Sequence, residues 1–563
     1  MRAGPGPQVG DPALPCEEGV TGSSPVEGLR RTAAANYSGL YCGAMISFKK
    51  LSSFLFVAAF VAAFGPVSGA SAQAAQISWT TCPKEAYPDP AFADALYPTL
   101  QCGTFKVPYD YGKPNGKQFT LALQKLPASG TKIGTLFTNP GGPGSPGRTS
   151  WTEAARIRMR NSFDLIGFDP RGVGETRPAF DCEKAGEAVP KLPPVDWVQI
   201  AAVQTILTAR ANRACQRKSA DFIAHVGTNN VVRDLDAMRA AVGDAKLNFW
   251  GMSYGSRIGY VYAYRYPQRV RAMILDGPIS PNGSWANFAR GRSGSNDEAL
   301  RFVRSVSPAT YAAVISTRNS LFASRLDIGT AGRSIRLGGY EWLGILTNKL
   351  SAQDSWPEIT ALAKQVAAAR IVGPGGYDAR AALREELAIA DAEDPDGVSA
   401  DGGANEAINC ADYADRPTAR ERARIVRNVV SRAPVFGGGL ASSTVTSCTG
   451  FTFRPDPVPR IASRASLARV RNVKLAISDS TADAATPLVW GRAMVRAFPS
   501  AFEVTQETGN HVNFLRTESD CVDDPLREYL LTLKTGPRRT TCLFTAPEGL
   551  DMSAVAAGKR KIG

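Results

Sequence analysis

Histidine is nearly absent from this chain of 563 residues, which contains only His225 and His511. Long apolar runs are missing too, because the most hydrophobic stretch, residues 54–64, is too short to span a bilayer comfortably. No C-x-x-C pair occurs, which argues against a zinc site or thioredoxin-like chemistry. The formal net charge is +14, but the basic residues are scattered. A nucleic-acid-binding protein would more often concentrate them in a patch, so we expect no nucleic-acid partner.

The first 75 residues differ in composition from the rest of the chain. Residues 1–44 are rich in Gly, Pro and Ser and show no periodicity. Residues 45–74 place two lysines before the apolar run and end in A-x-A cleavage candidates, the pattern of a secretory signal peptide. We therefore expect Met45 to be the true start and residues 1–44 to be a non-native or disordered leader. The expected location is secreted, periplasmic or cell-envelope, with no stable membrane anchor after signal cleavage.

The cysteines fit such an exported protein. Ten are present, and the eight that follow the signal peptide form an even set, which predicts disulfides in an oxidising compartment. The sequence does not fix their connectivity, although pairing in chain order closes four loops of moderate length. The eight candidates are Cys82, Cys102, Cys182, Cys215, Cys410, Cys448, Cys521 and Cys542.

The mature chain divides into three blocks and a tail. Residues 76–278 alternate short apolar runs with amphipathic stretches, which predicts an α/β fold with a mostly parallel sheet and crossover helices. Residues 279–462 carry helical periodicity almost throughout and predict a large helical insertion. Residues 463–549 return to the mixed pattern of the first block, and residues 550–563 are expected to form a flexible tail.

A G-x-S-x-G motif spans residues 251–255 and centres on Ser253. A five-residue motif of this kind can occur by chance in a glycine-rich chain. The surrounding sequence must therefore show whether Ser253 is catalytic. The apolar run LNFW precedes them and an amphipathic helical pattern follows. A nucleophile elbow needs this strand–turn–helix setting, with small flanking residues that permit close backbone approach. The motif therefore predicts Ser253 as a catalytic nucleophile.

A serine hydroxyl needs a base, and the histidine count restricts the choice. In strand–turn–helix serine hydrolases the chain order is serine, acid, histidine. His225 precedes Ser253, so only His511, in the loop sequence ETGNHVNF, can serve. A single histidine is usually structural, but His511 is required if this chain is a serine hydrolase.

Three aspartates compete for the role of the acid. Asp479 and Asp483 follow the predicted strand VKLAI, and we favour Asp483 because the acid usually lies a few residues past the strand end. Asp479 is then expected to cap or shape that loop. Asp276 is the third option, because it ends the strand that follows the nucleophile.

The oxyanion of an acyl-transfer reaction needs two backbone N–H donors. We expect one from Tyr254, the residue after the nucleophile. The other should come from the loop NPGGPGSPG, residues 139–147, which follows the predicted strand GTLFT. Gly142 is the expected donor, because a side chain at that position would block the approach of the substrate.

With these motifs in place, the chain resembles the secreted tripeptidyl and prolyl aminopeptidases of the α/β-hydrolase family, the proline iminopeptidase-like serine exopeptidases. The resemblance covers roughly residues 78–545 and is weakest in the helical insertion. The chain differs from the usual family pattern at Asn510, which precedes His511 where a G-H-G-like loop is frequent. The matching segments are NPGGPGSPG, DLIGFDPRGVGETRP with Thr176 where Ser is common, GMSYGSRIGYVYAYRYPQRVRAMILDGP, DSTADAATP with its D-x-x-T-P acid motif, and the C-terminal tail CVDDPLREYLLTLKTGPRRTTC.

The resemblance implies an α/β-hydrolase fold in which residues 279–462 form a helical cap over the active site. It implies a peptide substrate with a free N-terminus, from which tripeptides or proline-containing fragments are released. Cap carboxylates would hold the substrate's α-ammonium group, and Glu406 and Asp412 are candidates. Acyl transfer through Ser253, His511 and Asp483 needs neither a metal nor an organic cofactor.

Two other functions compete with the exopeptidase hypothesis. The same fold supports carboxylesterases and lactonases that act on small esters, because fold does not determine chemistry. A secreted binding protein with a relic triad is the alternative from a different class. The intact Ser, Asp and His set argues against it.

Overall fold

The computed structural model describes residues 76–87, 90–151, 159–182, 195–329, 336–371, 373–392, 403–517 and 519–551. All of them belong to one compact unit. The expected leader and signal peptide lie outside the described residues. Of the expected tail, only residues 550 and 551 are described.

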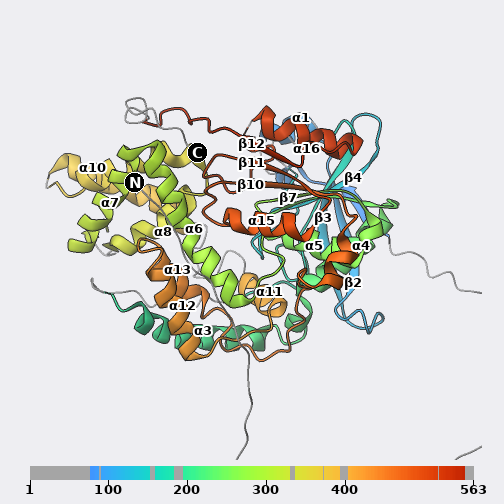
Figure 1. Cartoon of the computed structure of the whole chain (residues 1–563), viewed down its shortest axis with the longest axis horizontal. Helices are drawn as coiled ribbons and strands as arrows, with labels where there is room; N and C mark the ends of the chain where they lie inside the picture. The colour runs from blue at the N-terminus through green and yellow to red at the C-terminus, as the bar shows by residue number, and fades with distance from the viewer. Residues whose placement is uncertain are drawn as a thin grey trace, which may run out of the picture. The chain divides into compact units, whose positions relative to one another are not determined.

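The described residues include a ten-stranded sheet with the strand order β1-β2-β3-β5-β4-β6-β7-β10-β11-β12 (Figure 1). Its first strands pair antiparallel, and every pairing from β5 to β12 is parallel. The strands are β1 (Ser78–Thr81), β2 (Gln101–Pro108), β3 (Gln118–Leu126), β4 (Gly134–Asn139), β5 (Phe163–Phe168), β6 (Leu247–Met252), β7 (Val270–Asp276), β10 (Ala476–Ser480), β11 (Phe502–Gln506) and β12 (Arg539–Cys542).

Helices cover both faces of this sheet, because successive side chains of a strand point to opposite faces. Within β6, Phe249 packs into the cluster shared with α4 and α5, whereas Trp250 packs into the cluster shared with α16. The parallel strands are therefore buried on both sides, as their apolar runs predict. The helices nearest the sheet are α1 (Pro90–Leu96), α4 (Thr228–Ala241), α5 (Gly255–Arg265), α14 (Arg464–Val470), α15 (Leu488–Ala497) and α16 (Asp520–Thr532).

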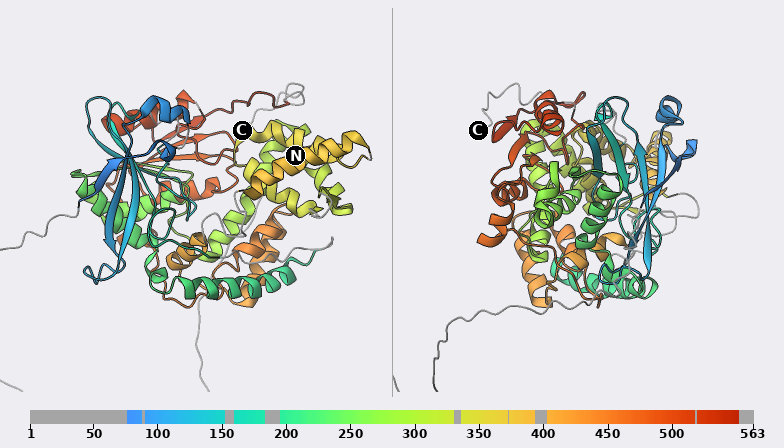
Figure 2. Two further views of the ribbon diagram at one scale, coloured as in Figure 1. Left: turned by 180° about the vertical axis from the view of Figure 1, so that it is seen from behind. Right: turned by 90° about the vertical axis from the view of Figure 1, so that its right-hand side faces the viewer.

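The block between β7 and β10 is mostly helical, as its periodicity predicts, and it builds apolar clusters of its own. Two short strands, β8 (Leu326–Asp327) and β9 (Arg336–Leu337), interrupt it. Its helices gather beside one end of the sheet (Figures 1 and 2). They are α6 (Trp285–Val306), α7 (Pro308–Ala323), α8 (Gly339–Lys349), α9 (Trp356–Ala368), α10 (Pro374–Ala392), α11 (Ala404–Asp412), α12 (Ala419–Val430) and α13 (Gly437–Thr444).

One helix of the first block joins this helical cap. The helix α3 (Trp197–Lys218) lies in residues 76–278, yet it packs against α12 and α13 (Figure 1). Ala201 of α3 shares an apolar cluster with Ile425 and Val429 of α12. The sequence block boundary at residue 278 therefore does not coincide with the packing boundary of the cap.

Four disulfides close successive loops, so the structure pairs the eight cysteines in chain order, which the sequence left open. They join Cys82 to Cys102, Cys182 to Cys215, Cys410 to Cys448 and Cys521 to Cys542. Four such bonds fit folding in an oxidising compartment.

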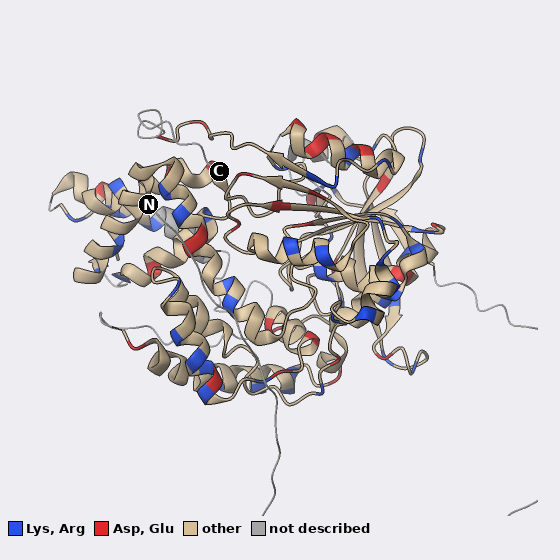
Figure 3. Cartoon of the chain, viewed as in Figure 1, with Lys and Arg blue, Asp and Glu red and all other residues tan. Residues whose placement is uncertain are grey.

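Charged residues of both signs are spread over the sheet-flanking helices and the cap (Figure 3). This distribution agrees with the scattered basic residues of the sequence. Among the helices that the structure describes, none has both the length and the apolar character needed to cross a bilayer.

Candidate active site

Ser253 occupies a strained turn between β6 and α5. Its φ of 53° lies in the left-handed region, which residues other than glycine rarely adopt. The two motif glycines permit this turn, because a Cβ on Gly251 would lie 2.3 Å from the carbonyl oxygen of Gly255. A Cβ on Gly255 would lie 2.6 Å from the carbonyl oxygen of Asn139. The glycines of G-x-S-x-G are thus required by close backbone approach, and Ser253 has the geometry of a nucleophile elbow.

The order of the parallel strands brings the glycine-rich loop beside this elbow. β4 lies between β5 and β6, and Asn139 at the end of β4 pairs with Gly251. Loops that follow neighbouring parallel strands meet at the same sheet edge. A Cβ on Gly141 would lie 2.8 Å from the Cβ of Ser253 and 3.0 Å from the nitrogen of Tyr254. The loop therefore lies directly against the nucleophile turn.

The N–H groups of the glycine-rich loop and of the residue after Ser253 differ in their hydrogen bonding. The N–H of Gly141 donates to the side-chain oxygen of Asn139 at 3.1 Å. Within the described part of the chain, the N–H groups of Gly142 and Tyr254 make no hydrogen bond. These are the two donors expected from the sequence, and both remain available to a ligand.

His511 pairs with Asp483. Its Nδ1 lies 2.8 Å from Oδ2 and 3.1 Å from Oδ1 of that carboxylate. The backbone N–H groups of Ala485 and Thr486 donate to Oδ1 of Asp483, at 2.6 and 2.8 Å. Asp483 is buried and the His511 side chain is 19% exposed, so His511 is accessible from solvent and Asp483 is not.

The two rival aspartates have other contacts. The carboxylate of Asp479 is buried near Glu503, and burial together with that neighbour raises its pKa well above the usual value. Asp276 accepts hydrogen bonds from the backbone N–H groups of Asn513 and Phe514, at 3.1 and 3.0 Å. Of the three candidates, Asp483 is the one that contacts the imidazole of His511.

The other histidine takes no part in this arrangement. His225 ends a short 3-10 helix, Ile223–His225, that precedes α4. Its carbonyl oxygen accepts hydrogen bonds from Arg171 and Asn230. Burial lowers the pKa of its imidazole, and within the described ranges no hydrogen bond joins His225 to Ser253 or Asp483.

Helix α11 of the cap contacts the glycine-rich loop. The side-chain N–H of Asn405 donates to the carbonyl oxygen of Pro143 at 2.9 Å, next to Gly142. Glu406 follows in the first turn of α11 and is partly exposed. The structure therefore places Glu406 on a helix that touches the glycine-rich loop.

Asp412, the other candidate for the substrate's α-ammonium group, has a different partner. Its Oδ2 accepts from Nη1 of Arg257 at 2.9 Å, and both side chains are fully buried. Its Oδ1 accepts from the N–H of Thr228 at 2.7 Å. Both carboxylate oxygens are thus engaged, so we correct this expectation: Asp412 joins α11 to α5 and α4.

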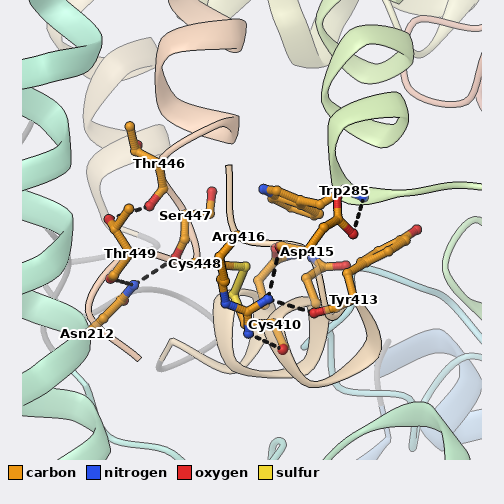
Figure 4. Close-up of a disulfide and its surroundings, with 12 residues drawn as sticks. Asn212, Trp285, Cys410, Tyr413, Asp415, Arg416, Thr446, Ser447, Cys448 and Thr449 are labelled. Atoms are coloured by element: carbon orange, nitrogen blue, oxygen red, sulfur yellow. Dashed lines mark hydrogen bonds between the residues drawn. A yellow bond between two sulfur atoms is a disulfide. The ribbon is translucent and has the colours of Figure 1, made fainter. Parts of the chain in front are cut away.

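A disulfide holds the far end of α11 (Figure 4). Cys410 is bonded to Cys448, and the guanidinium of Arg416 donates to the carbonyl oxygen of Cys410 at 2.6 Å. Asp415 accepts from the N–H of Trp285 at the start of α6, at 3.0 Å. The helix that carries Glu406 is therefore fixed to the rest of the cap.

Three contributors to the site were not identified from the sequence. Thr486 donates to Oδ2 of Asp483 at 2.8 Å and lies 3.2 Å from Nδ1 of His511. The threonine of the D-x-x-T-P motif could have identified Thr486, but we used the motif only as support for Asp483. No local sequence pattern identifies Arg257 or Asn513, because their partners lie far away in the chain.

The histidine, cysteine, aspartate and glutamate side chains of the described ranges form no cluster of three that could hold a metal ion. Asp483 and His511 contact each other through a hydrogen bond instead.

Comparisons with known proteins agree with this geometry. A family model described as alpha/beta hydrolase fold matches residues 134–360, and one described as TAP-like protein matches residues 433–542. Serine protease Hip1 of Mycobacterium tuberculosis is 46% identical over 188 residues, which cover 32% of this chain and 36% of that protein. Tripeptidyl aminopeptidase of Streptomyces lividans is 37% identical over 228 residues, which cover 38% and 41%.

A third relative is similar over a longer stretch. Carboxylesterase B of Mycobacterium tuberculosis is 29% identical over 511 residues, which cover 85% of this chain and 92% of that protein. By contrast, the matches span only 36% and 41% of the length of the protease and the aminopeptidase. Together with the sheet order and the nucleophile turn, the match over residues 134–360 shows an α/β-hydrolase fold, and residues 433–542 are similar to the TAP-like family.

Proposed function

We propose that this chain is an exported serine peptidase that releases short peptides, tripeptides or proline-containing fragments, from the free N-termini of peptide substrates. The observation that carries the chemistry is the hydrogen-bonded pair of His511 and Asp483, at the same sheet edge as the strained Ser253. The similarity to proteins named serine protease and tripeptidyl aminopeptidase supports the substrate class.

In the proposed reaction, Ser253 attacks the scissile carbonyl while His511 accepts its hydroxyl proton. Asp483 holds the imidazole through Nδ1 and stabilises its charged form. His511 then protonates the leaving amine, and a water molecule, deprotonated by His511, releases the acyl group from Ser253.

The oxyanion would be held by the N–H groups of Gly142 and Tyr254. Neither makes a hydrogen bond within the described part of the chain. Tyr254 also precedes the first turn of α5, whose N-terminal partial positive charge favours a developing anion.

Glu406 is the proposed partner of the substrate's α-ammonium group. It lies next to Asn405, which contacts Pro143 of the glycine-rich loop. A carboxylate there would form a charge-assisted hydrogen bond and set the distance from the substrate's N-terminus to Ser253. Asp412 is not part of this proposal, because Arg257 and Thr228 engage its carboxylate.

Action on small esters is the second candidate function. The similarity to the protein named Carboxylesterase B, which extends over 85% of this chain, favours it. The same triad and oxyanion donors would serve both reactions, because ester and peptide hydrolysis share an acyl-enzyme intermediate.

A panel of chromogenic mono-, di- and tripeptides separates these functions, with each substrate prepared with a free and with a blocked N-terminus. The proposal predicts cleavage of the free peptides, little cleavage of the blocked ones, and none by S253A. In E406Q, KM for free peptides should rise roughly tenfold or more with little change in kcat. Equal cleavage of free and blocked peptides would refute the exopeptidase, and hydrolysis of short esters alone would establish the esterase.

A further inference from the structure

Asp276 has contacts with two of the three turns that carry the proposed triad. Its carbonyl oxygen accepts from the N–H of Ser253 at 2.8 Å. Its carboxylate accepts from the N–H groups of Asn513 and Phe514, just beyond His511, at 3.1 and 3.0 Å. One residue at the end of β7 therefore contacts both the nucleophile turn and the histidine loop.

Asn513 continues this connection to the third turn. Its side-chain N–H donates to the carbonyl oxygen of Asp479 at 2.9 Å, and its side-chain oxygen accepts from the hydroxyl of Ser480 at 3.0 Å. Both partners end β10, just before the turn that carries Asp483. Asp276 and Asn513 together form a buried polar bridge, the 276–513 bridge, across all three turns.

The residue that follows Asp276 lies against the imidazole of His511. A Cβ on Gly277, the residue after Asp276, would lie 3.2 Å from both Nδ1 and Cε1 of His511. The backbone at Gly277 thus forms one wall of the space that the imidazole occupies. Movement of residues 276–277 would displace Ser253 and His511 relative to each other.

The carboxylate of Asp276 is costly to bury, which argues against an incidental role. Asp276 is completely inaccessible to solvent, and no cation pairs with it among the residues that the structure describes. Burial raises the pKa of its carboxyl group to about 6, despite the two backbone donors and the indole N–H of Trp250, which donates to Oδ2 at 3.3 Å. An ionised acceptor offers two oxygens to two consecutive N–H groups, which an amide cannot do.

We propose that Asp276 and Asn513 are positioning residues. They hold Ser253, His511 and Asp483 in the relative positions that catalysis requires. The inference deepens the proposed function and rests on it. Neither side chain touches the reacting atoms, so both act through the backbone of the turns. Displacing a catalytic group by about 1 Å can cost roughly a hundredfold in rate.

The test compares D276N and D276A with a matched control, D297N. Asp297 on α6 is also buried, and its two oxygens accept from the consecutive N–H groups of Val435 and Phe436 at 2.9 and 2.8 Å. It therefore makes the same kind of contact within the cap. For each variant, the rate of labelling by a fluorophosphonate, kcat and KM for a p-nitrophenyl ester, and the thermal midpoint are measured.

The bridge predicts a graded loss in kcat and in labelling rate, roughly tenfold in D276N and a hundredfold in D276A, with KM within about twofold of the wild type. D297N should lower the thermal midpoint while kcat and labelling stay near wild type. Equal kcat in folded D276N and wild type, or an equal loss in D297N, would overturn the inference.

The variant N513A provides an independent test of the proposal if both Asp276 variants fail to fold. It removes the two side-chain bonds to β10 but keeps the backbone N–H that donates to Asp276. Its kcat should fall at least fivefold at constant KM, and an unchanged kcat would overturn the inference. Absence of labelling in the wild type would instead refute the proposed function, so the two failures are distinguishable.

Discussion

The hydroxyl of Thr486 lies between the acid and the base of the proposed triad. It donates to Oδ2 of Asp483 at 2.8 Å and lies 3.2 Å from Nδ1 of His511. A carboxylate with its lone pairs engaged by Ala485, Thr486 and His511 has little freedom to rotate. Thr486 thus orients the group that orients the base.

T486V removes this hydroxyl and keeps the side-chain shape. We expect kcat to fall roughly three- to tenfold, because one hydrogen bond to an ionised carboxylate is lost. The matched control is T310V, which removes another buried threonine hydroxyl, bonded to Ser307 in the cap. Steady-state kinetics of both variants should show the loss in T486V alone, and an equal loss in T310V would contradict this role.

Asp276 should make stability depend on pH in a defined direction. Burial raises the pKa of its carboxyl group from 3.8 to about 6 on folding, so the folded state binds more protons than the unfolded state between these values. Stability is therefore greatest below pH 3.8 for this group and falls as the pH rises to 6. The shift corresponds to at most about 3 kcal/mol.

Urea unfolding of the wild type and of D276N at pH 4, 5, 6 and 7 measures this contribution. Relative to D276N, the wild type should lose free energy of unfolding as the pH rises from 4 to 6 and then level off. A difference between the two proteins that is independent of pH would contradict the raised pKa of Asp276 in the folded state.

At the scale of elements, α11 is one of the parts of the cap that contact the core beside the proposed site. Helix α6 is another, because Arg292, Ser295 and Asn296 donate to the carbonyl oxygen of Ala484. Asn405 contacts the glycine-rich loop at one end, and Asp412 pairs with Arg257 of α5 at the other. The disulfide of Cys410 fixes the same helix within the cap. Because α5 begins directly after the elbow, the pair of Asp412 and Arg257 connects the cap to the helix behind Ser253.

Breaking this pair from one side should be strongly destabilising. D412L or R257M alone leaves one buried group without its partner, at a cost of about 3–5 kcal/mol in the free energy of unfolding. The double variant D412L/R257M should cost much less than the sum, because no charge remains buried. The four urea midpoints complete the cycle, with D94N at the exposed pair of Lys84 and Asp94 as a near-neutral control. Additive losses would contradict a coupled buried pair.

At the scale of the whole molecule, strand alternation and the elbow could be predicted from the sequence because both depend on local patterns. LNFW followed by G-x-S-x-G becomes β6, Ser253 and α5, and the chain order of the cysteines matches the four disulfides. The histidine count identified His511 by elimination, and the structure pairs it with Asp483.

Contacts between distant segments could not be predicted, because no local pattern encodes them. The amphipathic helix α3 gives no sign that its apolar face packs on α12 and α13 instead of on the sheet. Asp412 resembled a solvent-facing cap carboxylate until the structure paired it with Arg257, 155 residues away in the chain. The 276–513 bridge spans 237 residues for the same reason.

The central claim is that Ser253 is a nucleophile activated by His511 and Asp483. Labelling of the purified protein with a fluorophosphonate, followed by peptide mapping, tests it most directly, with S253A and H511A as companions. The account predicts one adduct, on the peptide that contains Ser253, with none in S253A and a rate at least a hundredfold lower in H511A. An adduct on another residue, or a wild-type labelling rate in H511A, would contradict it.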